Sequence, residues 1–406
     1  MAQVEHINPR ILTWARETAG FTIPEAAPKL GLKDGARASA AEKLAAIEVD
    51  GQISRSVLQK AATVFRRPLI AFYLPEPPRR ADRGEDFRTS SAGTVSGKEE
   101  SMLDALVRDV RARQQLVREI LEDEEEAFQR PYVGSMPQNA SPGAVSSAIR
   151  EVLEVSPEAQ CRARSPVQLF GHLRAAAERA GVYVLLLGDL GSPQSDIGEH
   201  VFRGFALADG VAPFVVINDN DAAAGRSFSL IHELAHIVVG ASGISGPLRR
   251  SSAHGVERLC NDAASHFLLP SGALEQMAEG AQGADAQRAN DLSAAVAERW
   301  NVSQGVVVYR FARHGWISDE TASALFAGFT ERWRKTKERE KAERDPEAGG
   351  PGYYQLRRSM VGARLLDLAR RSLQGGSITR TTAAKVLGVR PTGVDSMLAP
   401  ERANNA

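Results

Sequence analysis

The sequence predicts an α+β protein that is mainly helical, with a small mixed sheet packed against one apolar helix and further helical domains at both ends. Three observations predict it. Apolar residues recur at helical spacing along most of the chain, three short apolar segments of strand type lie between residues 182 and 218, and an apolar helix follows them directly. That order favours a small sheet with the helix packed on its face.

The composition excludes several classes of protein. With 406 residues, 43% hydrophobic and 25% charged, the chain is long enough for two or three globular domains. Fifty basic and fifty acidic residues give no net attraction to nucleic acid or membrane, so such binding would need a local patch. Two cysteines are too few for a disulfide framework, and no cleavable signal opens the chain, so a cytoplasmic protein without membrane contact is expected.

The first domain is predicted over residues 1–78, with helices at 9–18, 23–30, 39–49 and 54–65. This arrangement resembles a Xre-type helix-turn-helix, in which the third helix would enter the major groove. The third helix carries Glu42 and Glu48, Pro28 lies inside the second helix, and the domain holds ten Lys/Arg against eight Asp/Glu. A DNA reader and a scaffold for protein contact or homodimer formation therefore both stay open.

Residues 79–140 are predicted to be a linker followed by a long helix from 98 to 126. Apolar residues line one side of that helix, and its acidic end at 122–126 is interpreted as a solvated face.

A third domain is predicted over residues 141–328. It begins with helices near 144–154 and 166–180 and continues with strands at 182–188, 201–207 and 213–218.

The helix after the last strand contains His232, Glu233 and His236 in an HExxH pattern. Two imidazoles four residues apart lie on one face of a helix and can reach a single tetrahedral Zn²⁺. The carboxylate of Glu233 can take a proton from a metal-bound water and pass it to a leaving amine, as peptide hydrolysis requires. The pattern therefore predicts a zinc peptidase site.

A catalytic zinc needs a third protein ligand and an open fourth position. A second predicted helix, with an apolar stripe along one side, begins at Glu257 and ends at Pro270. We predict Glu257 as the third zinc ligand. Asn261, one turn later, could orient a ligand histidine. Asp262, His254 and His266 are the rival ligands.

Four sequence blocks resemble the ImmA/IrrE family of metallopeptidases. They are Arg203-Gly-Phe-Ala-Leu207, Pro213-Phe-Val-Val-Ile-Asn218, Arg226 through His236, and Glu257 through Pro270; Asp86-Phe-Arg88 is also similar to a family segment. In the last block, Cys260 and Ala263 stand where the family usually has alanine and phenylalanine. The resemblance implies a zincin-like core, zinc held by His232, His236 and Glu257, catalysis by Glu233, and cleavage of a regulatory protein such as a transcriptional repressor.

Other residues have weaker assignments. Arg226 matches a family position, but pairing with Asp219 or Asp221 explains it equally well. Candidate donors to the oxyanion are His254, His266, Tyr309 and Arg310, and each has an ordinary structural role as its alternative.

Residues 329–352 are predicted to be a charged helix from 330 to 345 and a Pro/Gly-rich linker. The last domain, residues 353–406, is predicted to begin with a helix at 355–373 and to continue with a helix-turn-helix rhythm about Gly388. It holds nine Lys/Arg against three Asp/Glu, which makes it the better candidate for DNA contact; a helical docking domain is the alternative.

The leading hypothesis is thus a cytoplasmic zinc endopeptidase that cuts a regulatory protein. The alternative is a DNA-binding regulator or antitoxin-like protein whose zincin-like domain binds or senses a partner with little turnover. Recruitment to DNA would be compatible with both.

Overall fold

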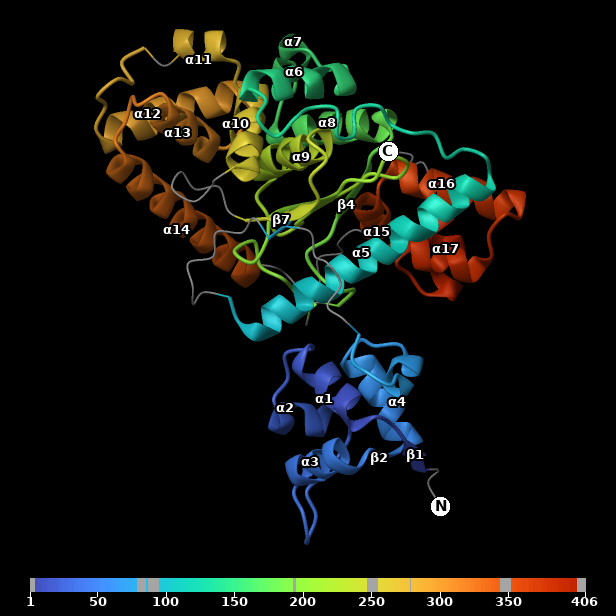
Figure 1. Ribbon diagram of the computed structural model, residues 1–406. Coiled ribbons are helices and arrows are strands. Elements are labelled where there is room, and N and C mark those ends of the chain that lie inside the picture. Colours follow the sequence, from blue (N-terminus) through green and yellow to red (C-terminus); the bar gives the residue numbers. More distant parts are fainter. Residues whose placement is uncertain are drawn as a thin grey trace. The chain divides into compact units, whose positions relative to one another are not determined.

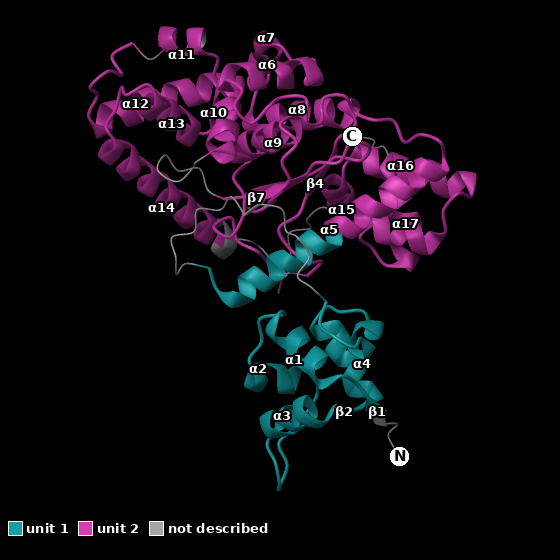
Figure 2. Cartoon of the chain, viewed as in Figure 1, with its two compact units in different colours: residues 1–83, 90–109 teal, residues 84–89, 110–406 magenta. Residues whose placement is uncertain are grey.

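The computed structural model of this chain describes residues 4–78, 85–86, 95–192, 195–246, 255–277, 279–343 and 352–399. The chain forms two compact units, which Figure 2 shows in different colours. The first comprises residues 1–83 and 90–109, and the second comprises residues 84–89 and 110–406.

The first unit is a small helical bundle with a two-stranded antiparallel ribbon. Polar caps fix the helix starts: Asn8 caps the first, and Ser39 forms a capping box with Glu42 on the third. Buried Ala26, Ala27 and Leu30 of the second helix belong to the core of this unit. Its elements are β1 (Val4–His6), α1 (Pro9–Glu17), α2 (Ile23–Lys29), α3 (Ala40–Asp50), β2 (Gln52–Ser54), α4 (Arg55–Val64), the 3₁₀ helix η1 (Leu69–Tyr73) and the start of α5 (Gly97–Asp123). The four predicted helices of this region are confirmed.

The two glutamates of α3 have structural roles. Glu42 accepts bonds from the Ser39 backbone and hydroxyl. Glu48 is buried against Arg16, whose Nε and Nη2 lie 2.7 and 3.0 Å from its carboxylate oxygens. Glu48 therefore stabilises the contact between α1 and α3.

The second unit contains a mixed five-stranded sheet with the strand order β3-β7-β5-β6-β4. The central strand β5 runs antiparallel to β6 and to β7, whereas β4 is parallel to β6 and β3 is parallel to β7. All three predicted strands are confirmed, and β3 and β7 were not predicted. The strands are β3 (Glu85–Asp86), β4 (Tyr183–Leu186), β5 (Gly204–Leu207), β6 (Phe214–Ile217) and β7 (Gly243–Ser245).

Helices cover this sheet and share one large apolar core with it. In Figure 1, α8, α9 and α10 gather over one side of the sheet. Helix α9 contacts β5 and β6 as well as α6, α8 and α10, so almost every residue along it is buried. The helices of this region are α6 (Pro142–Leu153), α7 (Pro157–Cys161), α8 (Pro166–Ala180), α9 (Ala223–Val238), α10 (Val256–Leu268), α11 (Ser271–Met277), α12 (Ala286–Trp300), α13 (Gln304–Arg313) and α14 (Asp319–Glu343).

The interpretation of the acidic run at 122–126 as a solvated face is confirmed for the exposed Glu122, Asp123 and Glu125 and is wrong for Glu124 and Glu126. Glu126 accepts two bonds of 2.5 Å from Arg371, and Glu124 accepts a bond from the Ser377 hydroxyl. Only 16% of the Glu124 side chain is exposed. Glu124 and Glu126 hold the C-terminal helices, because a bidentate arginine–carboxylate pair is the strong form of ion pair.

Two predicted helices have different bounds. The charged helix begins at Asp319 and not near residue 330. The predicted helix at 355–373 is two helices, α15 (Tyr353–Val361) and α16 (Ala363–Gly375), separated by Gly362 at φ 88°. The Glu178 carboxylate occupies the space of a side chain there and accepts a bond from Ala363 N at 3.1 Å. A glycine is required because only glycine combines this φ with that close approach.

The chain continues through α17 (Arg380–Leu387), the 3₁₀ helix η3 (Pro391–Gly393) and α18 (Val394–Leu398), with the expected turn at Gly388. Together these elements confirm the predicted α+β class, mainly helical with a small mixed sheet. Among the described residues, no helix combines the length and apolar character needed to cross a membrane.

Candidate metal centre

Helix α9 places His232, Glu233 and His236 in the centre of the second unit. Its start is fixed by Arg226, whose Nε and Nη2 donate to the backbone carbonyls of Asp221 and Asp219 at 3.1 and 2.6 Å. The sequence suggested an ion pair between Arg226 and the side-chain carboxylate of Asp219 or Asp221. The arginine instead binds the backbone carbonyls of these two residues. The three motif residues are 2%, 0% and 0% exposed.

Helix α10 brings Glu257 to the two histidines. It begins directly after Gly255, which has a positive φ of 61°. His232 Nε2 and His236 Nε2 lie 3.1 Å apart, and Glu257 Oε2 lies 3.4 Å from the first and 3.3 Å from the second. Within the described part of the chain, these are the three residues whose donor atoms are grouped closely enough to hold a metal ion.

The spacing of these three atoms fits a tetrahedral divalent ion such as zinc. Ligand atoms at about 2.0–2.1 Å from a tetrahedral centre lie about 3.3–3.4 Å from one another. Two imidazole nitrogens and one carboxylate oxygen form a donor set typical of catalytic zinc, which leaves one position for water or substrate. Both the types of the donor atoms and the distances between them therefore fit a zinc ion.

The electrostatics of the triad show how strongly it prefers a cation. Burial alone would raise the pKa of Glu257, but the adjacent His232 and His236 outweigh it and lower that pKa to about 2. Burial would likewise lower the pKa of His232, but Glu257, Glu233 and the side chain of Asn261 raise it. Asn261 is itself buried on α10, beside the histidine that the sequence suggested it could orient. A bound metal would replace the proton that the triad otherwise attracts.

Glu233 lies beside the triad and is completely buried. Both carboxylate oxygens are buried and lie outside regular hydrogen-bond geometry to the described residues, and the weak contact of the Ser245 hydroxyl offsets only a small part of the effect of burial. Burial raises the pKa of Glu233 to about 8. A buried carboxyl without a regular hydrogen bond costs stability, and groups of this kind cluster at functional sites.

Gly204 of β5 provides the space for this carboxyl. A Cβ at Gly204 would lie 2.7 Å from Glu233 Oε1 and 3.0 Å from its Cγ. Sequence analysis quoted Gly204 as part of a block but gave it no role. A glycine inside a strand is the signal that could have identified it, because such a glycine often marks a close approach by another group.

Ser245 of β7 is a second residue that sequence analysis missed. Its Oγ lies 3.1 Å from His232 Nε2, the nitrogen that also faces Glu257. The same hydroxyl lowers the pKa of Glu233 against the effect of burial. No sequence signal marks this serine, since β7 has only three residues.

The rival ligands are held elsewhere or lie outside the described residues. Asp262 accepts a bond of 2.7 Å from the Tyr309 hydroxyl and a bidentate contact from Arg313 at 2.9 and 2.7 Å. His266 is half-buried on α10, and burial lowers its pKa to about 4. His254 lies outside the described residues.

The candidate oxyanion donors also have other contacts. Tyr309 donates to Asp262, and Arg310 donates to the Ser271 hydroxyl at 3.1 Å and lies 3.2 Å from His314 Nε2. Neither contact involves the triad. Structural roles therefore account for Tyr309 and Arg310, because each connects α13 to a neighbouring helix.

The comparison with family models identifies the same region. Residues 177–312 match Peptidase_M78, the IrrE N-terminal-like domain. The match supports the ImmA/IrrE family. It covers α9, α10 and the strands β4 to β7, and therefore all the residues of the triad together with Glu233, Gly204 and Ser245. A search of curated proteins found no match.

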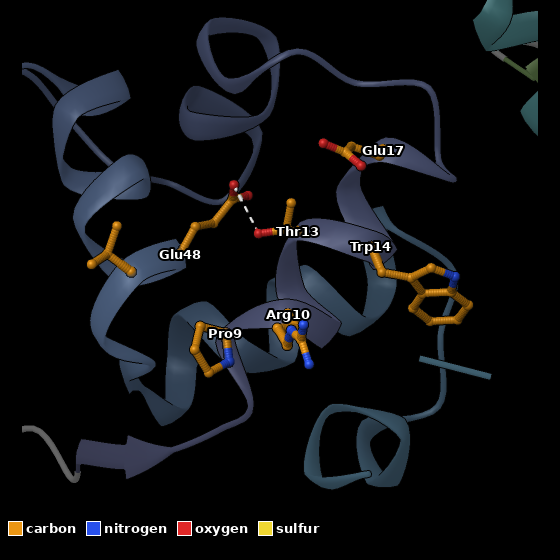
Figure 3. Close-up of a pocket in the computed structure, with 7 residues that line it drawn as sticks. Pro9, Arg10, Thr13, Trp14, Glu17 and Glu48 are labelled. Carbon is orange, nitrogen blue, oxygen red and sulfur yellow. Dashed lines mark hydrogen bonds between the residues drawn. The ribbon is translucent and has the colours of Figure 1, made fainter. Parts of the chain in front are cut away.

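The M78 domain thus combines a peptidase-type family match with a group of residues able to hold a divalent metal. The first unit offers a different kind of feature, a shallow hollow of about 450 Å³ between α1 and α3 (Figure 3). Its lining includes Arg10, Trp14 and Glu17, together with Glu48, which accepts a bond from Thr13 at 3.3 Å.

Proposed function

We propose that this protein is a cytoplasmic zinc endopeptidase, with zinc held by His232, His236 and Glu257 and with Glu233 as general base. The observation that carries the proposal is the convergence of three donor atoms within 3.1–3.4 Å next to a buried carboxylate without a regular hydrogen bond. Zinc, when bound, would supply a Lewis acid that polarises the scissile carbonyl and acidifies water.

The chain's own residues would perform the proton transfers. Glu233 would take the proton of the attacking water at its carboxylate and then deliver it to the nitrogen of the leaving amine. A raised pKa suits both tasks, because the group must accept a proton at neutral pH and hold it until the amine leaves. The apolar residues around α9 would exclude bulk water from these steps.

The substrate proposed is a regulatory protein such as a transcriptional repressor. This part of the proposal rests on the family match of residues 177–312 and on flanking helical regions that could recruit a partner. The N-terminal helices would serve as a helix-turn-helix module, either for DNA or for a protein contact that includes a second copy of the chain.

The test compares new N-termini produced in an extract of the source cell by the zinc-loaded protein and by its Glu233→Gln variant. We expect both proteins to hold about one zinc per chain and only the unsubstituted protein to generate new N-termini, concentrated in few proteins. Glu298→Gln, on an exposed position of α12, is the matched control and should cleave normally. Equal cleavage by the Glu233→Gln variant would refute the mechanism.

DNA contact by the C-terminal helices is a second proposal, favoured by exposed Lys385 and Arg390 on either side of the turn at Gly388. Other cations of this region are occupied, since Arg371 binds Glu126 and Arg364 donates to the Glu178 carbonyl. A salt-dependent gel shift with promoter DNA from the protein's own locus tests it. Loss of the shift in Lys385→Glu with Arg390→Glu is expected, and no shift at low salt would reject DNA contact.

A further inference from the structure

Strand β7 pairs antiparallel with β5 at the point where β5 passes the metal triad. The paired residues are Gly204 with Ser245, Phe205 with Ile244, and Ala206 with Gly243. Gly204 is also the residue whose missing side chain gives space to Glu233. Any backbone that pairs with this edge of β5 is therefore placed next to the general base.

The Ser245 hydroxyl lies in the space that a reacting group would need. It lies 3.1 Å from His232 Nε2, the nitrogen that also faces His236 and Glu257. An attacking water must likewise contact the metal and the general base together. The serine side chain and the proposed reaction thus compete for one position.

The proposed site is buried, as expected if Ser245 occupies the position of the attacking water. The four proposed site residues are at most 7% exposed, and both oxygens of Glu233 are inaccessible to solvent. A polypeptide substrate needs its backbone within reach of the metal and the base. Among the described residues, β7 occupies the edge of β5 along which such a backbone would pair.

We propose that β7 occupies the place of the substrate strand and must leave β5 before a polypeptide can bind. This inference rests on the proposed peptidase function. An extended substrate would then pair with β5 in place of β7, since an exposed strand edge binds extended peptides through backbone hydrogen bonds. In the closed form, the protein is inhibited by its own strand.

The side chains of β7 indicate which substrates would fit. Side chains alternate between the two faces of a strand, so Gly243 and Ser245 face α9 while Ile244 faces away, opposite Phe205. Ile244 is 1% exposed. The preferred substrate segment would be extended, with a small residue on each side of one apolar residue.

The short length of β7 makes its release feasible. It has three residues, and a strand of that length contributes few backbone hydrogen bonds to a sheet. Its outer edge is paired with the two-residue strand β3. Both β7 and β6 are buried and paired on both edges, but β6 has four residues and four-residue partners, β4 and β5, whereas the outer partner of β7 has only two residues.

A reversible crosslink tests the proposal. Ala206→Cys with Gly243→Cys would join β5 to β7, because directly opposite residues of an antiparallel pair lie within the range of a disulfide. Ala206→Cys with Val215→Cys would join β5 to β6 and is the matched control. Both variants carry Cys161→Ser, which removes the exposed thiol.

The probe is a fluorescein-labelled Gly-Ile-Ser peptide ending in a hydroxamate, measured by fluorescence anisotropy on zinc-loaded protein. Oxidation of the β5–β7 variant should weaken binding at least tenfold, reduction should restore it, and the control should bind equally in both states. A Gly-Asp-Ser hydroxamate should bind more weakly than the Gly-Ile-Ser probe. Equal binding by the oxidised and reduced β5–β7 variant, or no binding by any zinc-loaded form, would overturn the proposal.

Backbone amide exchange of the unsubstituted, metal-free protein provides a readout that needs neither zinc nor activity. The amides of β7 should exchange at least tenfold faster than those of β6. Equal protection of the two strands would overturn the proposal even if the protein proved to be a peptidase. Failure to hold zinc, with fast exchange in β7, would instead reject the peptidase function and leave the strand's release supported.

Discussion

Glu48 and Glu233 are two glutamates with buried side chains, and they differ in what contacts them. Glu48 accepts two bonds from Arg16 and one from Thr13. Glu233 accepts none of regular geometry from the described residues, although it is completely buried. The comparison teaches that burial alone does not separate structure from chemistry; the presence or absence of a partner does.

The same contrast applies to the spaces around them. The hollow between α1 and α3 is open, and its buried polar groups are paired, so it has the character of a surface feature (Figure 3). The metal triad lies in the interior of the M78 domain, with three donor atoms facing one another. The open hollow is therefore the weaker sign of catalysis here.

The largest expected effect is a loss of metal binding, which tests the difference between the metal triad and the hollow of the first unit. His236→Ala should weaken zinc binding by at least about 1,000-fold, because the remaining two donors cannot complete the site. His266→Ala, on the same helix as Glu257 but outside the triad, is the control and should bind zinc normally. Competition with a chelator measures both affinities, and similar affinities would place the metal elsewhere.

The paired glutamate should matter for stability. Glu48→Gln leaves the buried Arg16 with only the longer contact to the exposed Glu17 and should lower the free energy of unfolding by about 3 kcal/mol. Urea unfolding of the metal-free protein, followed by circular dichroism, measures this. A loss below about 1 kcal/mol would mean that the ion pair is not what joins α1 to α3.

Glu233, in contrast to Glu48, should lower the stability of the folded protein, by an amount that depends on pH. The folded-state pKa of Glu233 is raised to about 8 from 4.5, so the unfolded chain loses this proton above pH 4.5 while the folded protein keeps it until about pH 8. Glu233 therefore lowers the free energy of unfolding as pH rises through that window, by up to about 5 kcal/mol.

Metal-free Glu233→Gln should consequently be more stable than the unsubstituted protein at pH 8 and equally stable near pH 4.5. Urea unfolding at both pH values checks it. Glu257, with a pKa lowered to about 2, has its own effect only below pH 4.5 and does not disturb the comparison. A constant difference between the two proteins would show that Glu233 is ionised in the fold.

The smallest effect is expected at Gly204. Gly204→Ala would place a methyl group 2.7 Å from Glu233 Oε1, so cleavage should fall about ten- to a hundredfold while zinc is retained. Gly171→Ala, in α8 with open space around it, is the control. Unchanged cleavage by the Gly204→Ala variant would show that the position of the carboxyl is not critical.

Much of the M78 domain could be predicted because its signals are local. The HExxH spacing fixes two imidazoles on one helical face, and the apolar run at 182–187 specifies the buried strand β4. Glu257 could be selected only through its helix and the family resemblance. Its meeting with the histidines depends on the packing of α9 against α10, which no local pattern encodes.

The features that could not be predicted depend on tertiary contacts. Strand β7 is too short to show periodicity, so Ser245 carried no signal. The break at Gly362 depends on the approach of Glu178 from α8, and Glu126 after α5 is paired with Arg371 of α16. Each case joins residues far apart in the chain.

X-ray absorption at the zinc edge, on the purified and zinc-loaded protein, tests the metal centre most directly. The account predicts about one zinc per chain with two imidazole nitrogens and one carboxylate oxygen at about 2.0–2.1 Å, and loss of this zinc signal in His232→Ala. A protein that holds no zinc after loading, or a zinc without imidazole ligands, would contradict it.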